Sequence, residues 1–449
     1  MENAKIRIGN YRWVIVTLLL FSTTINYMDR QVISYLKPFF CSAVDQGGFG
    51  WTNQDFSYLT SFFLGVYALV SIYVGWFIDK IGTKLGLAIA LIIWSIFGMV
   101  NALAGGTLSM NIFIRSLFAV GEAGVFPASI KTVTEWFPKK ERALATSIFN
   151  SGTNMGAMAA ALFVPWCLTY FGNATGWKMA FILTGAVGFI WLIFWFWLYN
   201  PPTTQVRLSK PEFDYIHSDD DANEIQSADK AKIPWSKLLK YRQTWAFFIG
   251  KFMTDGVWWF YLFWLPDYLI KQFGMTTHQV RWPTFIVYGV AIIGSLVGGS
   301  IPLLLINKGM PVYKARMRSM LVIAFFPMIV LTTQYFGDTA RFGTSAMYLA
   351  VAVICIAAAA HQAWSANLFT TVSDMFPKKA IGSMVGIGTM AGGVGGIIIQ
   401  LVSGRLNDVF KTTPKTAYLI MFMICAVGYL LAWSMMKYLV PRHKPITDL

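Results

Sequence analysis

The stretch from Arg115 to Arg142, RSLFAVGEAGVFPASIKTVTEWFPKKER, decides the fold, because it sets two ionisable side chains in an apolar run that ends in a basic turn. Residues 132–140, TVTEWFPKK, recur as residues 371–379, TVSDMFPKK, with six of nine positions identical and an offset of 239. The same offset carries Glu122 onto His361. Two homologous halves are therefore predicted, and a repeat of this length suits a duplicated membrane bundle with binding sites between its halves.

The composition indicates a membrane protein. The chain has 449 residues, of which 56% are hydrophobic and only 13% charged, which is too apolar for a soluble protein of this size. Runs of about 20 apolar residues, enough to cross roughly 30 Å of hydrocarbon, occur twelve times. They lie near 13–35, 54–78, 85–104, 110–132, 143–167, 177–199, 243–270, 282–305, 319–336, 344–372, 383–403 and 417–437. We therefore predict an all-α membrane protein of twelve transmembrane helices in two homologous six-helix bundles.

A polar segment divides the six spans of each half. Residues 201–242 contain Pro201, Pro202 and Pro211, the acidic run Asp219–Asp221 and several lysines, so we predict a cytoplasmic linker between an N-terminal bundle (1–200) and a C-terminal bundle (243–449). The segment has no catalytic constellation or phosphate-binding glycine loop, which argues against an enzyme. The four cysteines lack the close spacing of metal ligands, so no metal site is expected, and pairing of Cys41 with Cys167 stays open.

The distribution of positive charge predicts the orientation. The net charge is +15, and with the N-terminus placed inside, 24 of the 36 Lys and Arg fall in cytoplasmic segments. This bias follows the positive-inside rule and predicts a multi-pass cell-membrane protein with both termini cytoplasmic. Membrane orientation accounts for the basic balance, so nucleic acid is not expected as a partner. The basic N-terminus resembles a secretory signal, but it continues into Tyr27-Met-Asp-Arg30 and is interpreted as an uncleaved first span.

Two adjacent charges, Asp29 and Arg30, lie in the first span. Each would cost roughly 2.5 to 3.5 kcal/mol if it faced lipid, so both are expected to face the protein interior. They serve either a functional site or a structural lock between helices. Because about 100° separates adjacent residues on a helix, we predict that they contact different partners.

The fourth span carries Arg115 and Glu122 seven residues apart, on one stripe of a helix and about 10 Å from each other along its axis. Burial and a nearby cation act in opposite directions on a carboxyl group, so Glu122 is a candidate to take up and release a proton. The alternative is a structural ion pair.

Other polar groups are weaker candidates. Asn154 lies within Gly152-Thr-Asn-Met-Gly156, whose GxxxG spacing predicts close helix packing. Lys251 and Asp255 form either a pair within one helix or, with Trp259 and its aromatic neighbours, a surface for an anion and a sugar ring. In His361-Gln362-Ala-Trp364, a lone histidine is usually structural, but its place in the repeat opposite Glu122 favours a cavity.

Several motifs carry a resemblance to a known family. The loop GWFIDKIGTK at 75–84 resembles the major facilitator signature G-x-x-x-D-R/K-x-G-x-R/K, a conformational latch. Thr83 occupies the x before the last basic residue, where members of the family usually carry a further basic residue. The whole chain resembles the anion:cation symporter family of this superfamily, and within it the bacterial hexuronate transporters. The motifs are Tyr27-x-Asp29-Arg30, Arg115 with Glu122, Glu135-Trp-Phe-Pro138, Asn150-Ser-Gly-Thr-Asn154, Trp258-Trp-Phe-Tyr-Leu-Phe-Trp-Leu-Pro266 and Ala360-His-Gln-Ala-Trp-Ser-Ala-Asn367.

The resemblance implies proton-coupled import of a small anionic sugar acid across the bacterial inner membrane, with the proton as coupling ion and no cofactor. Asp29 and Glu122 would be the proton-linked acids and Arg30 and Arg115 would hold the substrate carboxylate. The further residues expected at the binding site are Tyr27, Tyr67, Asn154, Lys251, Trp259, His361, Gln362 and Trp364. A monomer in the lipid bilayer is expected to be functional.

Two alternatives remain open. An organic phosphate antiporter would grip its substrate with one basic residue from each of the first and seventh spans, here Arg30 and Lys251. A nutrient sensor that does not transport normally needs a signalling tail or domain, for which the segment after Lys437 gives little room.

Overall fold

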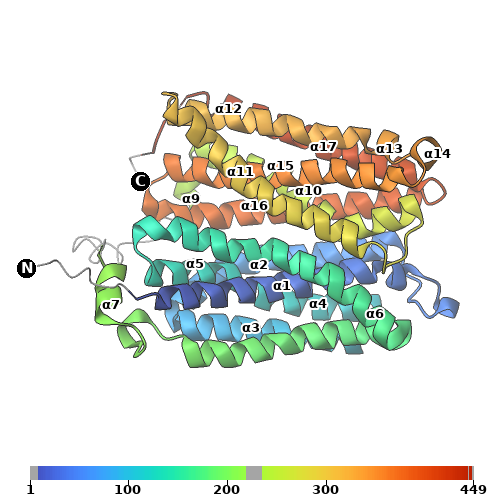
Figure 1. The fold of residues 1–449 in the computed structure, drawn as a ribbon, viewed down its shortest axis with the longest axis horizontal. Coiled ribbons are helices and arrows are strands. Elements are labelled where there is room, and N and C mark those ends of the chain that lie inside the picture. The colour runs from blue at the N-terminus through green and yellow to red at the C-terminus, as the bar shows by residue number, and fades with distance from the viewer. Residues whose placement is uncertain (1–8, 219–234, 443, 447–449) are drawn as a thin grey trace, which may run out of the picture.

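The computed structural model describes residues 9–218, 235–442 and 444–446. Long helices run side by side along the longest axis of the molecule, and both ends of the chain lie at the same end of the bundle (Figure 1). We call this the proximal end and the opposite one the distal end. In this view the helices of the N-terminal half, blue to green, lie below those of the C-terminal half, yellow to red (Figure 1).

The helices follow one another in a simple order. The N-terminal half contains α1 (Tyr11–Cys41), α2 (Asn53–Ile81), α3 (Thr83–Val100), α4 (Leu108–Glu122), α5 (Val125–Trp136) and α6 (Lys139–Leu198). Between the halves lie α7 (Lys210–Ile216) and α9 (Trp235–Leu238). The C-terminal half contains α10 (Arg242–Phe273), α11 (Arg281–Asn307), α12 (Val312–Phe325), α13 (Thr333–Phe336), α14 (Thr339–Phe342), α15 (Ser345–Met375), α16 (Lys378–Val409) and α17 (Pro414–Leu439). Short 3₁₀ turns occur at Val44–Gln46, Asn101–Leu103, Pro202–Thr204 and Phe326–Thr332.

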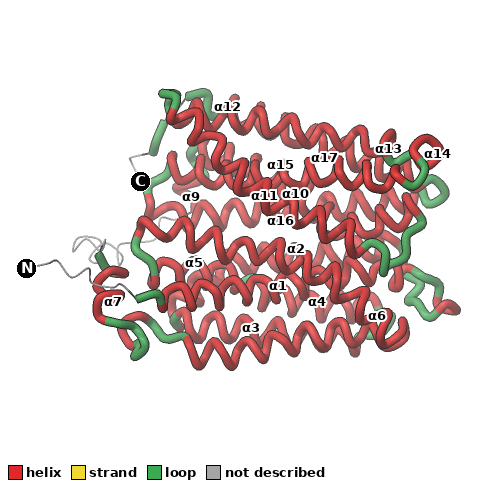
Figure 2. Tube along the Cα trace, viewed as in Figure 1, coloured by secondary structure: helices red, strands yellow, loops and turns green. Residues whose placement is uncertain are grey.

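The predicted fold class is confirmed. Nine helical segments of the described chain are long and apolar enough to cross a membrane. One of them belongs to the 60-residue α6, which is interrupted at Gly172, where φ is 72°, and therefore makes two passes. The long helices α1 and α10 also run the length of the bundle, although their polar residues keep them out of the nine (Figures 1 and 2). The nine apolar segments make ten passes, because α6 counts twice, and α1 and α10 complete the twelve predicted spans.

Glycine-mediated packing brings the helices together as the GxxxG spacing predicts. A Cβ atom on Gly156 would lie 2.3 Å from the carbonyl oxygen of Thr24, so only glycine allows α6 to approach α1 this closely. Gly294 likewise faces the backbone of Ala359, which brings α11 against α15. These contacts confirm the packing role predicted for the GxxxG motifs.

Part of the predicted linker is attached to the N-terminal half. Glu212 of α7 is 1% exposed and accepts hydrogen bonds from the backbone N–H groups of Tyr11 and Arg12, at 3.1 and 3.0 Å. Arg12 also pairs with Glu141 at 2.9 Å. A carboxylate from α7 therefore satisfies free N–H groups at the start of α1. The acidic run Asp219–Asp221 lies outside the described residues.

The loop between α2 and α3 makes polar contacts despite its threonine. Thr83 donates a hydrogen bond to Glu135 at 2.8 Å, and the hydroxyl of Tyr199 donates to the same carboxylate at 2.9 Å. Lys131 pairs with Asp79 at 3.2 Å, as expected for a lysine that reaches the end of the bundle.

All four cysteines are free thiols, which answers the question of pairing between Cys41 and Cys167.

Candidate functional site

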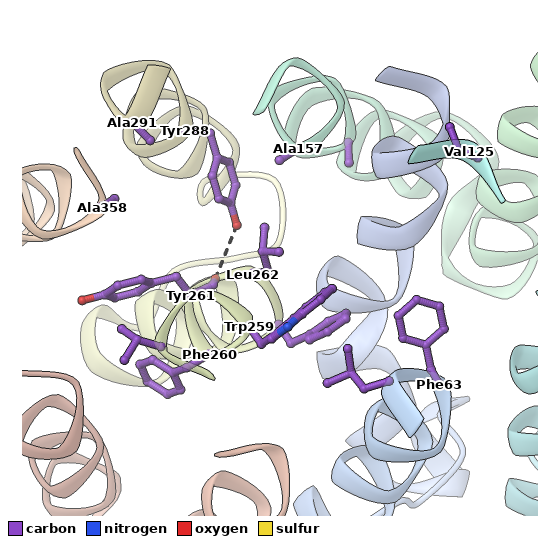
Figure 3. Close-up of a cluster of buried hydrophobic side chains, with 14 of the residues drawn as sticks. Phe63, Val125, Ala157, Trp259, Phe260, Tyr261, Leu262, Tyr288, Ala291 and Ala358 are labelled. Atoms are coloured by element: carbon purple, nitrogen blue, oxygen red, sulfur yellow. Dashed lines mark hydrogen bonds between the residues drawn. The ribbon is translucent and has the colours of Figure 1, made fainter. Parts of the chain in front are cut away.

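The guanidinium of Arg30 lies in an aromatic cage where the two halves meet. Its side chain is 1% exposed, and its Nε donates to Oε2 of Glu122 at 2.9 Å. Its Cζ atom lies over four rings: Tyr27 at 4.3 Å, Tyr67 at 4.9 Å, Trp259 at 5.3 Å and Phe63 at 5.5 Å. Trp259 comes from α10 in the C-terminal half and points toward the helix that carries Phe63 (Figure 3). Cation–π contacts from both halves therefore surround one buried cation.

A second guanidinium supports the first. Arg115 of α4 is fully buried, and its Nη2 donates to the backbone oxygen of Arg30 at 2.9 Å. Its Cζ lies 4.1 Å from the centre of the Phe118 ring and 5.2 Å from that of Phe63. Arg115 thus contacts α1 rather than pairing with Glu122 on its own helix.

Several hydrogen-bonding atoms of this group lack partners among the described residues. They are Nη1 of Arg30, Nε and Nη1 of Arg115, and Oε1 of Glu122. A buried polar group without a partner costs roughly 1–3 kcal/mol, and more when it is charged. The group therefore offers three donors and one acceptor that a ligand or a proton would satisfy.

Asp29 faces a different helix from Arg30. It is 2% exposed and accepts a hydrogen bond from Nε1 of Trp94 on α3 at 3.0 Å. The prediction that the two adjacent charges contact different partners is confirmed, since Arg30 pairs with Glu122 and Asp29 with Trp94.

The C-terminal half contributes a paired lysine. Nζ of Lys251 lies 2.6 Å from Oδ2 of Asp255, one turn later on α10, and 4.6 Å from the centre of the Phe369 ring. Lys251 and Asp255 therefore form an ion pair within one helix, which is one of the two interpretations that the sequence allowed. Neither of these two contacts of Lys251 involves Arg30, Arg115 or Glu122.

His361 and Trp364 face the interior of the C-terminal half. Nδ1 of His361 is 2.7 Å from the Tyr429 hydroxyl, and its ring stacks on Trp258 with 4.8 Å between centroids. Trp364 is fully buried and lies edge-on to Tyr429. Both residues thus pack against α17, and this geometry favours the structural interpretation of the histidine.

Two further residues that were expected at the binding site, Asn154 and Gln362, contact each other across the two halves. Nε2 of Gln362 donates to Oδ1 of Asn154 at 3.4 Å, which connects α15 with α6. Of the residues expected at the binding site, the structure therefore brings together Tyr27, Arg30, Tyr67, Arg115, Glu122 and Trp259. It places Asp29 behind them against α3, and Asn154 with Gln362 at a separate contact between the halves.

Three aromatic residues of the site were not predicted. Phe63 lies four residues before Tyr67, so the helical period of α2 was a signal that both face the same way. Phe118 lies one turn from Arg115 on α4 and carried the same signal. Trp94 lies in an apolar run of α3 whose pattern gives no indication of its hydrogen bond to Asp29.

Comparisons with known proteins identify the family of the chain. The family model for the Major Facilitator Superfamily matches residues 19–399. The hexuronate transporter of Escherichia coli K12 is 27% identical over 433 residues, covering 96% of this chain and 95% of that protein. The D-galactonate transporter of Escherichia coli O6:H1 is 30% identical over 434 residues, covering 94% and 96%. The galacturonate transporter of Dickeya chrysanthemi is 29% identical over 298 residues, covering 66% and 83%.

Solved structures share the fold at low identity. A D-xylose–proton symporter superposes with a TM-score of 0.72 at 15% identity, covering 97% of this chain and all of that one. A bacterial homolog of the human lysosomal transporter Spinster, in an inward-facing and occupied conformation, gives a TM-score of 0.70 at 18% identity, covering 99% of this chain and all of that one.

Proposed function

Because this chain belongs to the Major Facilitator Superfamily, we propose that it is a secondary transporter that imports a monovalent sugar acid by proton symport through alternating access. The substrate is a hexuronate such as galacturonate or glucuronate, or a related aldonate, the classes named for the three relatives described above. One observation carries the proposal. A buried arginine with a free donor, paired with a carboxylate that has a free acceptor, lies among aromatic rings from both halves.

The free donors of Arg30 and Arg115 suit a carboxylate. Arginine presents its N–H groups in a planar fork that meets both oxygens of a carboxylate, and such charge-assisted hydrogen bonds are stronger than neutral ones. The rings of Tyr27, Tyr67 and Trp259 beside Arg30 would cover the apolar face of a pyranose and leave its hydroxyl groups to polar side chains.

The Arg30–Glu122 pair suggests how a proton is coupled to the substrate. A substrate carboxylate and Glu122 compete for the same guanidinium, and two carboxylates at one cation repel each other. A proton on Glu122 removes this competition and frees Arg30 for the substrate. Asp29, buried on the next residue of α1, is the second acid proposed to exchange a proton.

The balance of buried charge favours a substrate with one negative charge. The two arginines of the site are matched by Asp29 and Glu122, and Lys251 is matched by Asp255 at 2.6 Å. One sugar carboxylate entering with one proton leaves this balance unchanged. A second carboxylate would meet no unmatched cation among these residues. The same pairing of Lys251 argues against the phosphate antiporter, which needs a free cation there.

Counterflow uptake by purified protein in liposomes tests the proposal. We expect uptake of galacturonate, glucuronate or galactonate, with accumulation driven by a proton gradient, and little uptake of galactarate or neutral sugars. Exchange of preloaded glucose 6-phosphate without any need for a proton gradient would instead identify an organic phosphate antiporter. No exchange with any compound of the panel would favour a sensor.

The charge distribution supports an inner-membrane location with the proximal end, which holds both termini, in the cytoplasm. This orientation is part of the proposal and makes the distal end the outer one.

A further inference from the structure

A buried ion pair joins the two halves at the distal end. Nζ of Lys37, near the end of α1, lies 2.7 Å from Oδ2 of Asp267 on α10, and the two side chains are 1% and 4% exposed. Asp267 also accepts a hydrogen bond from Tyr418, and Nζ of Lys271, one turn later on α10, lies 2.9 Å from the same carboxylate oxygen. The lysine donates to Asn53 at 2.8 Å and lies over the ring of Trp264. Loss of Asp267 would leave Lys37 buried without a carboxylate, which is strongly destabilising, whereas loss of Lys37 would leave Asp267 paired with Lys271.

A carboxylate of the C-terminal half holds the start of α2. Asp408 on α16 accepts hydrogen bonds from the backbone N–H groups of Asn53 and Gln54, at 3.0 and 2.8 Å, and from the Asn53 side chain at 2.8 Å. These N–H groups belong to the first turn of a 29-residue helix, where negative charge is favoured. Lys271 reaches the same asparagine at 3.0 Å. The first turn of α2 is therefore bound to α10 and α16 of the other half.

Gln400 connects this region with the aromatic cage. Its side chain is fully buried; Oε1 accepts from Trp264 at 2.6 Å and from Thr60 of the other half at 3.2 Å. Its Nε2 donates to the backbone oxygen of Trp259 at 3.1 Å. The Gln400 amide therefore holds the backbone of Trp259, whose ring contacts Arg30, and also joins α16 to α2.

The two regions also share helices. Lys37 follows Arg30 by seven residues on α1, and Asp267 follows Trp259 by eight on α10, so each step is about 10–12 Å along its helix. A movement that separates α1 from α10 at the distal end would also draw Trp259 away from Arg30. Further hydrogen bonds between the halves join α2 to α16, where Thr60 contacts Gln400 and Ser61 contacts the backbone oxygen of Ile397, and join Asn154 to Gln362.

We propose that Lys37, Asp267 and Asp408 form an outer gate that also positions Trp259 against Arg30, so that the sugar-acid site is complete only while the gate is closed. This proposal rests on the proposed transport function and orientation. Lys37, Asp267 and Asp408 are positioning residues: they bind each other's half of the molecule at the distal end, and none of their hydrogen bonds or ion pairs described above involves Arg30, Arg115 or Glu122. Binding of a sugar acid then favours the closed gate, because the closed state alone offers the full set of contacts.

The gate is tested by the accessibility of a cysteine beneath it. Ser61 of α2 is buried eight residues below Asn53, so Ser61→Cys in a chain without its four native cysteines reports opening toward the outside. We expect a membrane-impermeant maleimide, added to intact cells, to label it slowly. Lys37→Met should increase the labelling rate at least tenfold, and Asp408→Ala should increase it as well. The matched control is Lys178→Met, an exposed lysine of α6 that contacts Trp177 within its own half.

Charge reversal separates a gate from a folding defect. The triple variant Lys37→Asp, Asp267→Lys, Lys271→Gln restores an ion pair in the opposite sense without a like charge one turn away on α10, and should return labelling to within about threefold of the parent. Labelling of the single variants at the parental rate, with normal expression and a monodisperse elution profile, would overturn the gate. Failure of the triple variant to restore slow labelling would show that the pair does not close the distal end.

The link to the binding site has its own readout. A compound that counterflow has shown to be carried should slow labelling of Ser61→Cys at least threefold, and Lys37→Met should remove this protection. Unchanged labelling in the presence of such a compound would refute the link between gate and site. Because labelling without substrate does not depend on which compound is carried, a wrong substrate class and a wrong gate give different results.

Discussion

Replacing Arg30 with lysine keeps the charge of the site but removes the planar fork, and its effect can be estimated from the contacts of the guanidinium. Nε pairs with Glu122 at 2.9 Å, so Nη1 is the donor left for the substrate. A lysine ammonium has no second nitrogen to hold both carboxylates in this geometry, and it is more strongly hydrated. Losing one charge-assisted hydrogen bond in a buried site is worth about 1.5–3 kcal/mol, which is roughly ten- to a hundredfold in affinity.

We therefore expect Arg30→Lys to raise the concentration of galacturonate or glucuronate needed for half-maximal counterflow by that factor in liposomes. The matched control is Arg341→Lys, because Arg341 lies in the short helix α14, is exposed and stacks over Tyr335 far along the chain from the site. The control should stay within about twofold of the parent. An Arg30→Lys variant that also stays within twofold, at equal reconstitution, would refute the assignment of Arg30 as the carboxylate-binding group.

Four further outcomes are expected. Glu122→Gln and Asp29→Asn should each abolish accumulation driven by a proton gradient, since an amide keeps the volume but cannot exchange a proton. Parental accumulation in both would leave the acids as structural partners. Glucose and galactose should compete with labelled sugar acid at least tenfold less well than the acids, because they leave the buried arginines without an anion, and equal potency would contradict this. A cysteine at Pro445 should react with impermeant maleimide only after cells are opened, and labelling from outside would refute the topology. Gly156→Leu should lower the melting temperature in detergent by several degrees, because a Cβ there meets the Thr24 carbonyl at 2.3 Å; Gly299→Leu, with open space at its Cβ, is the control.

Local patterns in the sequence predicted the parts of the structure that depend on a single helix. Hydropathy located the passes, and the gap between the runs 143–167 and 177–199 contains the break at Gly172. Because neighbouring residues on a helix point about 100° apart, Asp29 and Arg30 were predicted to contact different partners, and they do. The GxxxG spacing placed close backbone contacts at Gly156. In each case the signal lies within one or two turns of chain, where helix geometry alone decides what faces together.

Partners from distant helices could not be predicted in this way. Arg115 and Glu122 share a stripe on one helix, but Glu122 pairs with Arg30, which precedes it by 92 residues. Lys37 pairs with Asp267, 230 positions away, and no pattern in the sequence indicated this pairing. A carboxylate in a membrane bundle has several cations within possible reach, and only the packing of whole helices determines which one it meets.

The repeat itself shows how the two halves have different chemistry. The offset of 239 carries Arg115 onto Ile354 and Glu122 onto His361, so the C-terminal copy has no arginine and no acid at these places. Ile354 is fully buried, and His361 hydrogen-bonds to Tyr429 within its own half. The charged groups proposed to bind an anion and exchange a proton are therefore concentrated in α1 and α4, whereas α10 and α15 supply an aromatic ring and an amide at the contact between the halves. It follows that substitutions at Arg30 and Glu122 should change the dependence of transport on proton concentration, while substitutions at Trp259 and Gln362 should change the preference among sugar acids and leave that dependence intact.

Measuring the competition profile of galacturonate, glucuronate and galactonate at two pH values for Glu122→Gln and Gln362→Ala would decide between these roles. A shifted preference with unchanged pH dependence in the first variant, or the reverse in the second, would contradict this division of roles.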